Sequence, residues 1–271
     1  MKRKLLLTIV CMTISAAAAQ MMYAEESPIT PDGTYLYAER DTCDLYLDVY
    51  NPAKGSQTSI DGKMKPTIVF MFGGGFIGGA RDDASYNHWF RTLTRNGYRV
   101  ISIDYRLGLK GSNKVGIAQV NVLDKAIHMA VEDLFSATAF MIDNAEALGI
   151  DPENIVVSGS SAGAISVMQA EYEICNSTSW TEVLPEGFNY SGVMSFSGAI
   201  LSRKGKVKYA KEPCPRSCFT EQPTSWFHTI RSHSSTWASS AAESWWRDSK
   251  SSVTTTTCIT SSTMGMRSPD P

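Results

Sequence analysis

The pentapeptide Gly159-Ser160-Ser161-Ala162-Gly163 constrains the fold more than any other feature of this 271-residue chain. It stands between a short apolar run, residues 154–157, and a segment with helical spacing, residues 162–172. Glycines two residues before and after a serine remove the Cβ atoms that would clash in a sharp turn from strand to helix. Such a turn lifts the serine hydroxyl clear of the backbone and points the N-terminus of the next helix toward it.

Strand-like and helix-like segments alternate along the rest of the chain. Residues 44–49 alternate polar and apolar positions, as in a half-buried strand, whereas residues 67–72, 98–105 and 192–196 have the composition of strands buried on both faces. Residues 120–148 carry one apolar stripe at spacings of three and four, which predicts a long helix ended by Gly149. This order predicts an α/β fold with a mostly parallel, doubly covered sheet.

A second glycine motif, Gly73-Gly74-Gly75-Phe76, follows the strand predicted at residues 67–72. In a serine hydrolase such a loop supplies backbone N–H groups to an oxyanion hole, because only glycine lets the backbone come so close. An alternative is a dinucleotide fingerprint over Gly73, Gly75 and Gly78, with Asp104 holding a ribose. Strand-like sequence already precedes this loop, and the alternative leaves the serine turn unexplained.

Together these motifs make residues 30–201 resemble the α/β-hydrolase esterases, in particular secreted bacterial carboxylesterases and carbohydrate esterases. The matching segments are Leu47-Asp48-Val49-Tyr50-Asn51-Pro52, the glycine loop, Asp104-Tyr105-Arg106-Leu107, and Asp151-Pro152 before the serine pentapeptide. The resemblance implies that Ser161 is the nucleophile, that Gly159 and Gly163 form its elbow, and that the N–H groups of Gly74, Gly75 and Ala162 form the oxyanion hole. Phe72 stands where the loop of this family often begins with His.

The resemblance further implies hydrolysis of carboxylic esters through an acyl-enzyme, without a metal or an organic cofactor. The substrate would be a small ester or an acylated carbohydrate, such as acetyl or feruloyl groups on plant polysaccharide. Phe76 and Trp89 are candidate aromatic residues of the pocket. A non-catalytic exported binding protein on the same scaffold is a second hypothesis.

The catalytic acid and base cannot be assigned. In this fold the chain order is serine, acid, histidine, so both must follow Ser161. His88 and His128 come before the serine. The later candidates, which have neither a flanking glycine nor a preceding strand, are His228, His233, Asp248 and Asp270. The chain is therefore expected to be impaired as an enzyme.

Residues 213–271 differ sharply from the rest in composition. Of these 59 residues 24 are Ser or Thr; none is Leu, against 14 Leu before them, and only one of the 20 Gly lies here. This segment has too few aliphatic residues to build further strands, so the sheet is expected to end after residues 192–196 and the tail to be disordered. A genuine Ser/Thr-rich secreted tail is the simplest alternative.

The genetic code suggests that this tail is the right gene translated in a shifted frame. A shifted codon consists of the last base of one codon and the first two bases of the next. From Arg216 onward, the shifted codons permit a buried strand followed by the sequence Y/H-G-T-A-D-K-L-V-P. Near the end, the shifted codons of residues 264–267 permit G-H-E. These are the settings in which the resembled family presents its acid and its histidine. A frameshift near residue 212, natural or from sequencing, is therefore predicted.

The N-terminus has the pattern of a signal peptide. Lys2, Arg3 and Lys4 precede an apolar stretch over residues 5–19 that ends in three alanines. The predicted organisation is a signal peptide at 1–19, a truncated hydrolase domain at 20–212 and an aberrant tail at 213–271, in a secreted or periplasmic protein.

The net charge and the cysteines bear on the classes of partner and on disulfide formation. A net charge of −2 argues against a nucleic-acid partner, and no apolar run reaches the roughly 18 residues of a membrane span. In an oxidising compartment Cys43 and Cys175 could pair, which sequence alone leaves open, as it does the oligomeric state.

Overall fold

The computed structural model describes residues 28–111, 120–200, 207–221 and 253–255. Within these residues an eight-stranded sheet has the order β1-β2-β6-β5-β7-β8-β9-β10, and a small hairpin, β3-β4, lies apart from it. The strands are β1 Gly33–Arg40, β2 Cys43–Tyr50, β3 Ser59–Ile60, β4 Lys63–Met64, β5 Thr67–Met71, β6 Arg99–Ile103, β7 Ile155–Ser160, β8 Gly192–Phe196, β9 Arg216–Glu221 and β10 Val253–Thr255. The helices are η1 Ala84–Tyr86, α2 Asn87–Arg95, α3 Val120–Asp143, α4 Ala145–Leu148, α5 Ala162–Cys175 and η3 Ser179–Thr181.

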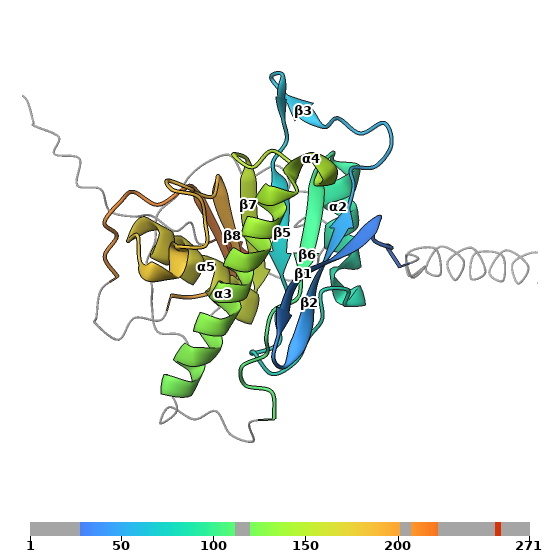
Figure 1. The fold of residues 1–271 in the computed structure, drawn as a ribbon. Coiled ribbons are helices and arrows are strands. Elements are labelled where there is room, and N and C mark those ends of the chain that lie inside the picture. Colours follow the sequence, from blue (N-terminus) through green and yellow to red (C-terminus); the bar gives the residue numbers. More distant parts are fainter. Residues whose placement is uncertain (1–27, 112–119, 201–206, 222–252, 256–271) are drawn as a thin grey trace, which may run out of the picture.

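Five central strands, β6, β5, β7, β8 and β9, run parallel, whereas β1, β2 and β10 pair antiparallel at the two ends of the sheet. Helices α3 and α5 cross in front of the sheet and α2 lies behind it (Figure 1). Behind the sheet, Phe90 of α2 packs against Phe70 and Tyr50, with ring centroids 5.3 and 5.1 Å apart. The prediction of a mostly parallel, doubly covered α/β sheet is confirmed.

The long helix predicted at residues 120–148 is a helix in two pieces. The middle of its apolar stripe is fully buried, with Val131, Leu134 and Met141 each 0% exposed. The chain leaves helical geometry at Asn144, between α3 and α4. Gly149 then ends α4 with a left-handed φ of 62°, a conformation that glycine adopts without steric cost.

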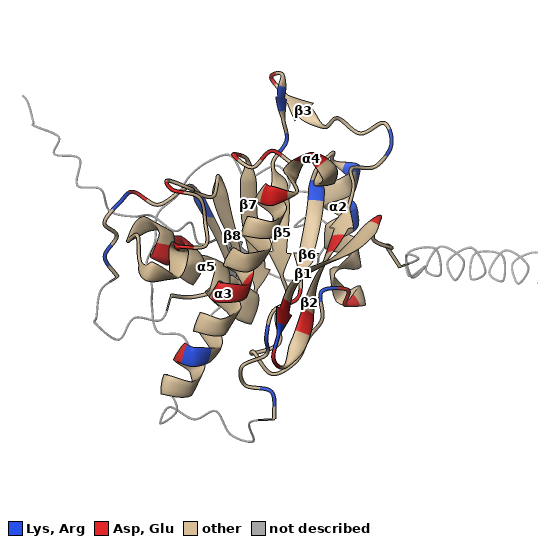
Figure 2. Cartoon of the chain, in the orientation of Figure 1, with Lys and Arg blue, Asp and Glu red and all other residues tan. Residues whose placement is uncertain are grey.

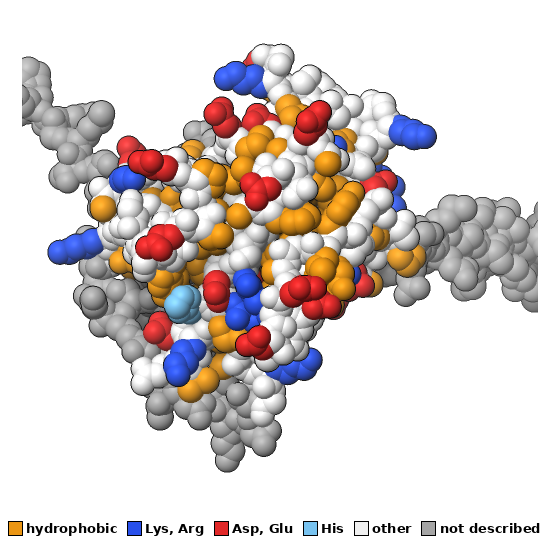
Figure 3. Space-filling view, viewed as in Figure 1, with side chains coloured by type: hydrophobic (Ala, Val, Ile, Leu, Met, Phe, Trp, Pro, Cys, Tyr) orange, Lys and Arg blue, Asp and Glu red, His pale blue; other side chains and the backbone are white. Residues whose placement is uncertain are grey.

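Acidic and basic side chains are interspersed over the strands and helices (Figure 2), and the surface in Figure 3 shows the same mixture between apolar side chains. No helix in the described ranges is long and apolar enough to cross a bilayer. Cys43 is exposed and Cys175 is buried, and both are free thiols. The two cysteines are therefore not paired with each other in this structure.

The sheet does not end at β8, so that expectation was wrong. β9 runs parallel to β8, and β10 pairs antiparallel with β9. The prediction counted aliphatic residues, but the exposed N–H and C=O groups of a β8 edge can be paired by any extended backbone. In β9 the side chain of Cys218 is 5% exposed, and Phe219 stacks on Phe196 with centroids 4.8 Å apart.

Several other predictions fall outside the described residues. They are the signal peptide at 1–19 and the assignments of His228, His233, Asp248 and Asp270. The frameshift remains a prediction as well, because β9 places part of the tail in the sheet without testing how the tail arose.

Candidate active site

The two glycine motifs meet at one edge of the sheet. Met71 of β5 pairs with Gly159 of β7, so the loop after β5 and the turn after β7 leave the sheet side by side. A Cβ atom built on Gly73 would lie 3.4 Å from the Cβ of Ser161. The carboxyl ends of parallel strands are where α/β folds bind their ligands.

Ser161 occupies a strained backbone conformation, with φ 49° and ψ −110°. Non-glycine residues in sparsely populated regions of this kind cost about 1–3 kcal/mol each. The backbone holds the turn from both sides: the N–H of Ser161 donates to the carbonyl of Phe196 at 2.8 Å, and its carbonyl accepts from the N–H of Ile165 at 2.9 Å. The residue is exposed to solvent. This is the sharp strand-to-helix turn that the pentapeptide predicts.

The two glycines of the pentapeptide are required by packing. A Cβ atom on Gly163 would lie 2.2 Å from the carbonyl oxygen of Met71, and one on Gly159 would lie 2.4 Å from the carbonyl carbon of Gly163. The first turn of α5 therefore sits directly against the ends of β5 and β7. This contact turns the helix N-terminus toward Ser161.

The glycine loop brings free backbone donors to the same edge. Gly74 and Gly75 have φ values of 123° and 64°, and a Cβ atom on Gly74 would lie 2.0 Å from the carbonyl oxygen of Gly78. Within the described residues, the N–H groups of Gly74, Gly75 and Ala162 donate no hydrogen bond. That these three N–H groups form an oxyanion hole stays a prediction.

Comparisons with known proteins agree with this geometry. The BD-FAE family model matches residues 47–176. Bile salt-activated lipase of Rattus norvegicus is 32% identical over 52% of this chain and 22% of its own length. Phenmedipham hydrolase of Pseudarthrobacter oxydans is 31% identical over 52% of this chain and 26% of its own length. Over these residues the chain is similar to α/β-hydrolases of the esterase and lipase lineage. It spans only about a quarter or less of the length of these relatives.

Other similar proteins include the neuroligin-like protein glit-1 of Caenorhabditis elegans, 31% identical over 58% of this chain and 20% of its own length. Among solved structures, butyrate-bound Est2 of Thermogutta terrifontis is 26% identical and covers 64% of this chain and 56% of its own, with a TM-score of 0.46.

The glycine loop of this chain does not have the geometry of a dinucleotide site. In that fingerprint a helix opens directly at the glycines, and the third glycine permits close helix packing. Here α2 begins only at Asn87, and a Cβ atom on Gly78 would meet no atom within 4 Å. The carboxylate of Asp104 is bound to the Arg81 guanidinium at 2.6 Å instead of facing open space. Burial raises the pKa of Asp104, and the ion pair with Arg81 opposes that rise.

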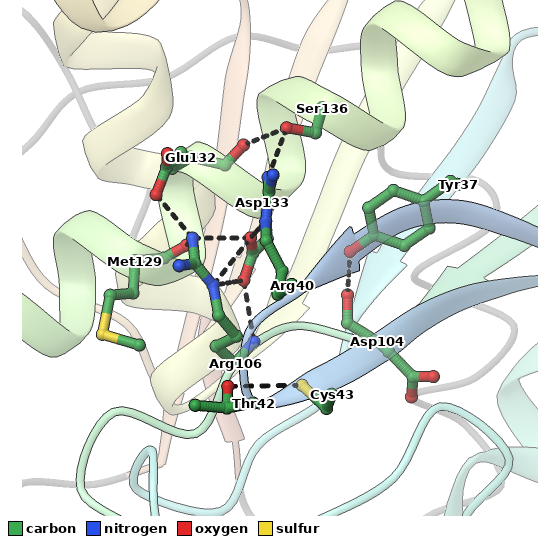
Figure 4. A network of polar contacts seen from close by, with 10 residues as sticks. All are labelled: Tyr37, Arg40, Thr42, Cys43, Asp104, Arg106, Met129, Glu132, Asp133 and Ser136. Atoms are coloured by element: carbon green, nitrogen blue, oxygen red, sulfur yellow. Dashed lines mark hydrogen bonds and ion pairs between the residues drawn. The ribbon is translucent and has the colours of Figure 1, made fainter.

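The segment after β6 is anchored by a buried polar network (Figure 4). The carboxylate of Asp133, which is 0% exposed, accepts from the backbone N–H of Arg106 at 2.8 Å and from its Nε at 2.9 Å. Arg40 of β1 donates its Nε to the same carboxylate at 3.2 Å. The network ties the Asp104–Leu107 segment to α3 and β1, and Tyr105 of this segment donates its hydroxyl to the Phe72 carbonyl at the start of the glycine loop.

An aromatic cluster adjoins Ser161. The ring of Phe196, whose carbonyl holds the Ser161 N–H, meets Trp89 edge-to-face at 5.4 Å and stacks on Phe219. Sequence analysis missed Phe196 and Phe219, and no sequence signal marked them. Phe76 and Trp89, expected to line the pocket, are only 1% and 5% exposed, so the structure places them in the core.

The described residues do not supply an evident acid or base. Among these residues none forms a hydrogen bond with the Ser161 hydroxyl. His88 is exposed in the first turn of α2, and His128 stacks on Trp180 with ring centroids 3.7 Å apart. No group of three His, Cys, Asp or Glu residues in the described ranges has the arrangement of a metal site.

Proposed function

We propose that this chain cleaves carboxylic esters through an acyl-enzyme formed on Ser161. The observation that carries the proposal is the strained, exposed Ser161 beside three unengaged backbone donors, those of Gly74, Gly75 and Ala162. This arrangement suits acyl transfer, because the strain presents the hydroxyl and the donors meet the charge that develops on the carbonyl oxygen.

In the proposed reaction, the Ser161 oxygen attacks the ester carbonyl carbon while its proton passes to a base. The carbonyl oxygen becomes an oxyanion that accepts hydrogen bonds from the glycine loop and from Ala162. Collapse of the tetrahedral intermediate releases the alcohol and leaves the acyl group on Ser161. Water then attacks the acyl-enzyme and releases the acid.

We further propose that this chain performs the reaction poorly. A tail translated out of frame after about residue 212 would lack the acid and the histidine, so Ser161 would keep its proton. Enzymes that lose their triad retain about 10³–10⁴-fold acceleration over water from the oxyanion hole and binding alone. A turnover number within the ordinary range for esterases would contradict the frameshift.

The substrate we propose is an ester of an apolar acyl group with a carbohydrate or a small alcohol. We propose that the protein is exported and acts on this substrate outside the cytoplasm. Phe196, which is partly exposed and accepts the Ser161 N–H with its carbonyl, supports an apolar acyl group. The basic and apolar N-terminal segment supports export.

The Ser161→Ala variant tests this function. Hydrolysis of p-nitrophenyl acetate by the wild-type chain should be weak but above background, and the substitution should remove it, because only Ser161 can form the acyl-enzyme. Ser160→Ala, which changes the neighbouring hydroxyl, is the control and should keep the wild-type rate. Equal rates in wild type and Ser161→Ala would instead favour the non-catalytic binding protein.

A further inference from the structure

A single peptide group at the start of the glycine loop is held at both of its ends. Its carbonyl, on Phe72, accepts a hydrogen bond from the hydroxyl of Tyr105 at 2.7 Å. Its N–H, on Gly73, donates to the hydroxyl of Tyr86 at 2.9 Å. Because a peptide group is planar, two hydrogen bonds on opposite edges fix its orientation about the chain axis.

Both tyrosines are held by neighbouring rings. The ring of Tyr105, 3% exposed, stacks on Phe72 with centroids 4.4 Å apart. The ring of Tyr86 packs edge-to-face on Phe70 at 4.7 Å. Burial raises the pKa of Tyr105 well above the ordinary value of a tyrosine, so its hydroxyl keeps its proton and remains a donor. The two hydroxyls therefore act as fixed partners of the peptide group.

The two residues after Gly73 are also glycines, whose backbone dihedral angles no side chain restricts. Gly74 and Gly75 have positive φ values and no side chains, so their restraints come from backbone hydrogen bonds. The N–H of Gly73 is already bound to Tyr86 and cannot serve an oxyanion. The N–H of Gly75 lies in a peptide group whose carbonyl, on Gly74, already accepts from the N–H groups of Ile77 and Gly78. The direction of the Gly74 N–H is therefore the one that depends most on the peptide before it.

We propose that Tyr86 and Tyr105 are positioning residues that fix the Phe72–Gly73 peptide and thereby aim the N–H group of Gly74 at the oxyanion. The inference rests on the proposed function for its catalytic consequence, but the fixing of the loop can be measured without turnover. Neither tyrosine contacts the reacting atoms; each acts through the backbone.

Tyr86→Phe and Tyr105→Phe remove one hydroxyl each and leave the ring packing in place. Tyr190→Phe is the matched control, because Tyr190 is also buried and its hydroxyl bonds to Thr138 at 2.9 Å, away from the loop. Amide hydrogen exchange of peptides covering residues 72–79 should become about tenfold faster in the two loop variants, as expected for loss of about 1.4 kcal/mol of local stability. The control should leave this segment unchanged.

Ester hydrolysis provides the second measurement. The two loop variants should lower kcat about tenfold with little change in KM, because a misdirected donor affects the transition state more than the bound substrate. Unchanged exchange over residues 72–79, or an equal change in Tyr190→Phe, would overturn the proposal. If the wild-type chain shows no Ser161-dependent turnover, the proposed function fails, and hydrogen exchange alone decides whether the tyrosines position the loop.

Discussion

Gly163→Ala should lower the free energy of unfolding by about 3 kcal/mol or more, one of the two largest effects expected in this chain. The added methyl would lie 2.2 Å from the carbonyl oxygen of Met71 and 2.6 Å from its carbonyl carbon. Backbone atoms in the central strand cannot move aside as a flexible side chain could. Helix α5 would have to shift away from β5, which would also displace Ser161.

Urea denaturation followed by circular dichroism measures this loss. The matched control is Gly78→Ala, since a Cβ atom there meets nothing within 4 Å and the residue has no left-handed φ. The control should stay within about 0.5 kcal/mol of the wild type. If both variants lose the same small amount, the tight contact between α5 and β5 does not exist in solution.

Asp133→Ala should cost about 3–5 kcal/mol, because it leaves the charges of Arg106 and Arg40 without their buried partner. The carboxylate is 0% exposed and accepts hydrogen bonds from both arginines and from the backbone of the segment after β6. Loss of these contacts should also loosen that segment, which carries Tyr105.

Glu132→Ala provides the control for this effect. Glu132 is the neighbour of Asp133 and also pairs with Arg106, but its side chain is 54% exposed. Solvent-exposed ion pairs contribute only about 0–1 kcal/mol, so this variant should unfold close to the wild type. A comparable loss in both variants, measured by thermal unfolding, would mean that burial does not set the strength of the network.

The central strands and the serine turn could be predicted from the sequence because their signals are local. Apolar runs define β5, β7 and β8, and Gly159 and Gly163 specify a turn that only glycine permits. The break at Asn144 carried no comparable signal, because the apolar stripe continues through it.

Other features depend on contacts between distant segments. β9 has a polar sequence and pairs because β8 offers a free edge, so counting aliphatic residues missed it. The hydroxyls of Tyr86 and Tyr105 reach the same peptide group from segments 19 residues apart in the sequence, a meeting that only the fold produces. Hydrogen bonds of this kind have no sequence pattern.

The site is expected to be half complete, with a positioned nucleophile and its backbone donors but without a paired acid and histidine. The strain at Ser161 and the tight contacts of Gly159 and Gly163 belong to the part of the chain before residue 212. The nucleophile should therefore remain in place even if everything after that residue is aberrant.

Covalent modification by a fluorophosphonate tests this claim most directly, because the reagent needs a presented serine and an oxyanion hole. Intact-mass and peptide analysis after long incubation should show one slowly formed adduct, located on Ser161 and absent from Ser161→Ala. A chain that stays unmodified, or that carries the adduct on other serines to the same extent, would contradict the assignment of Ser161 as the nucleophile.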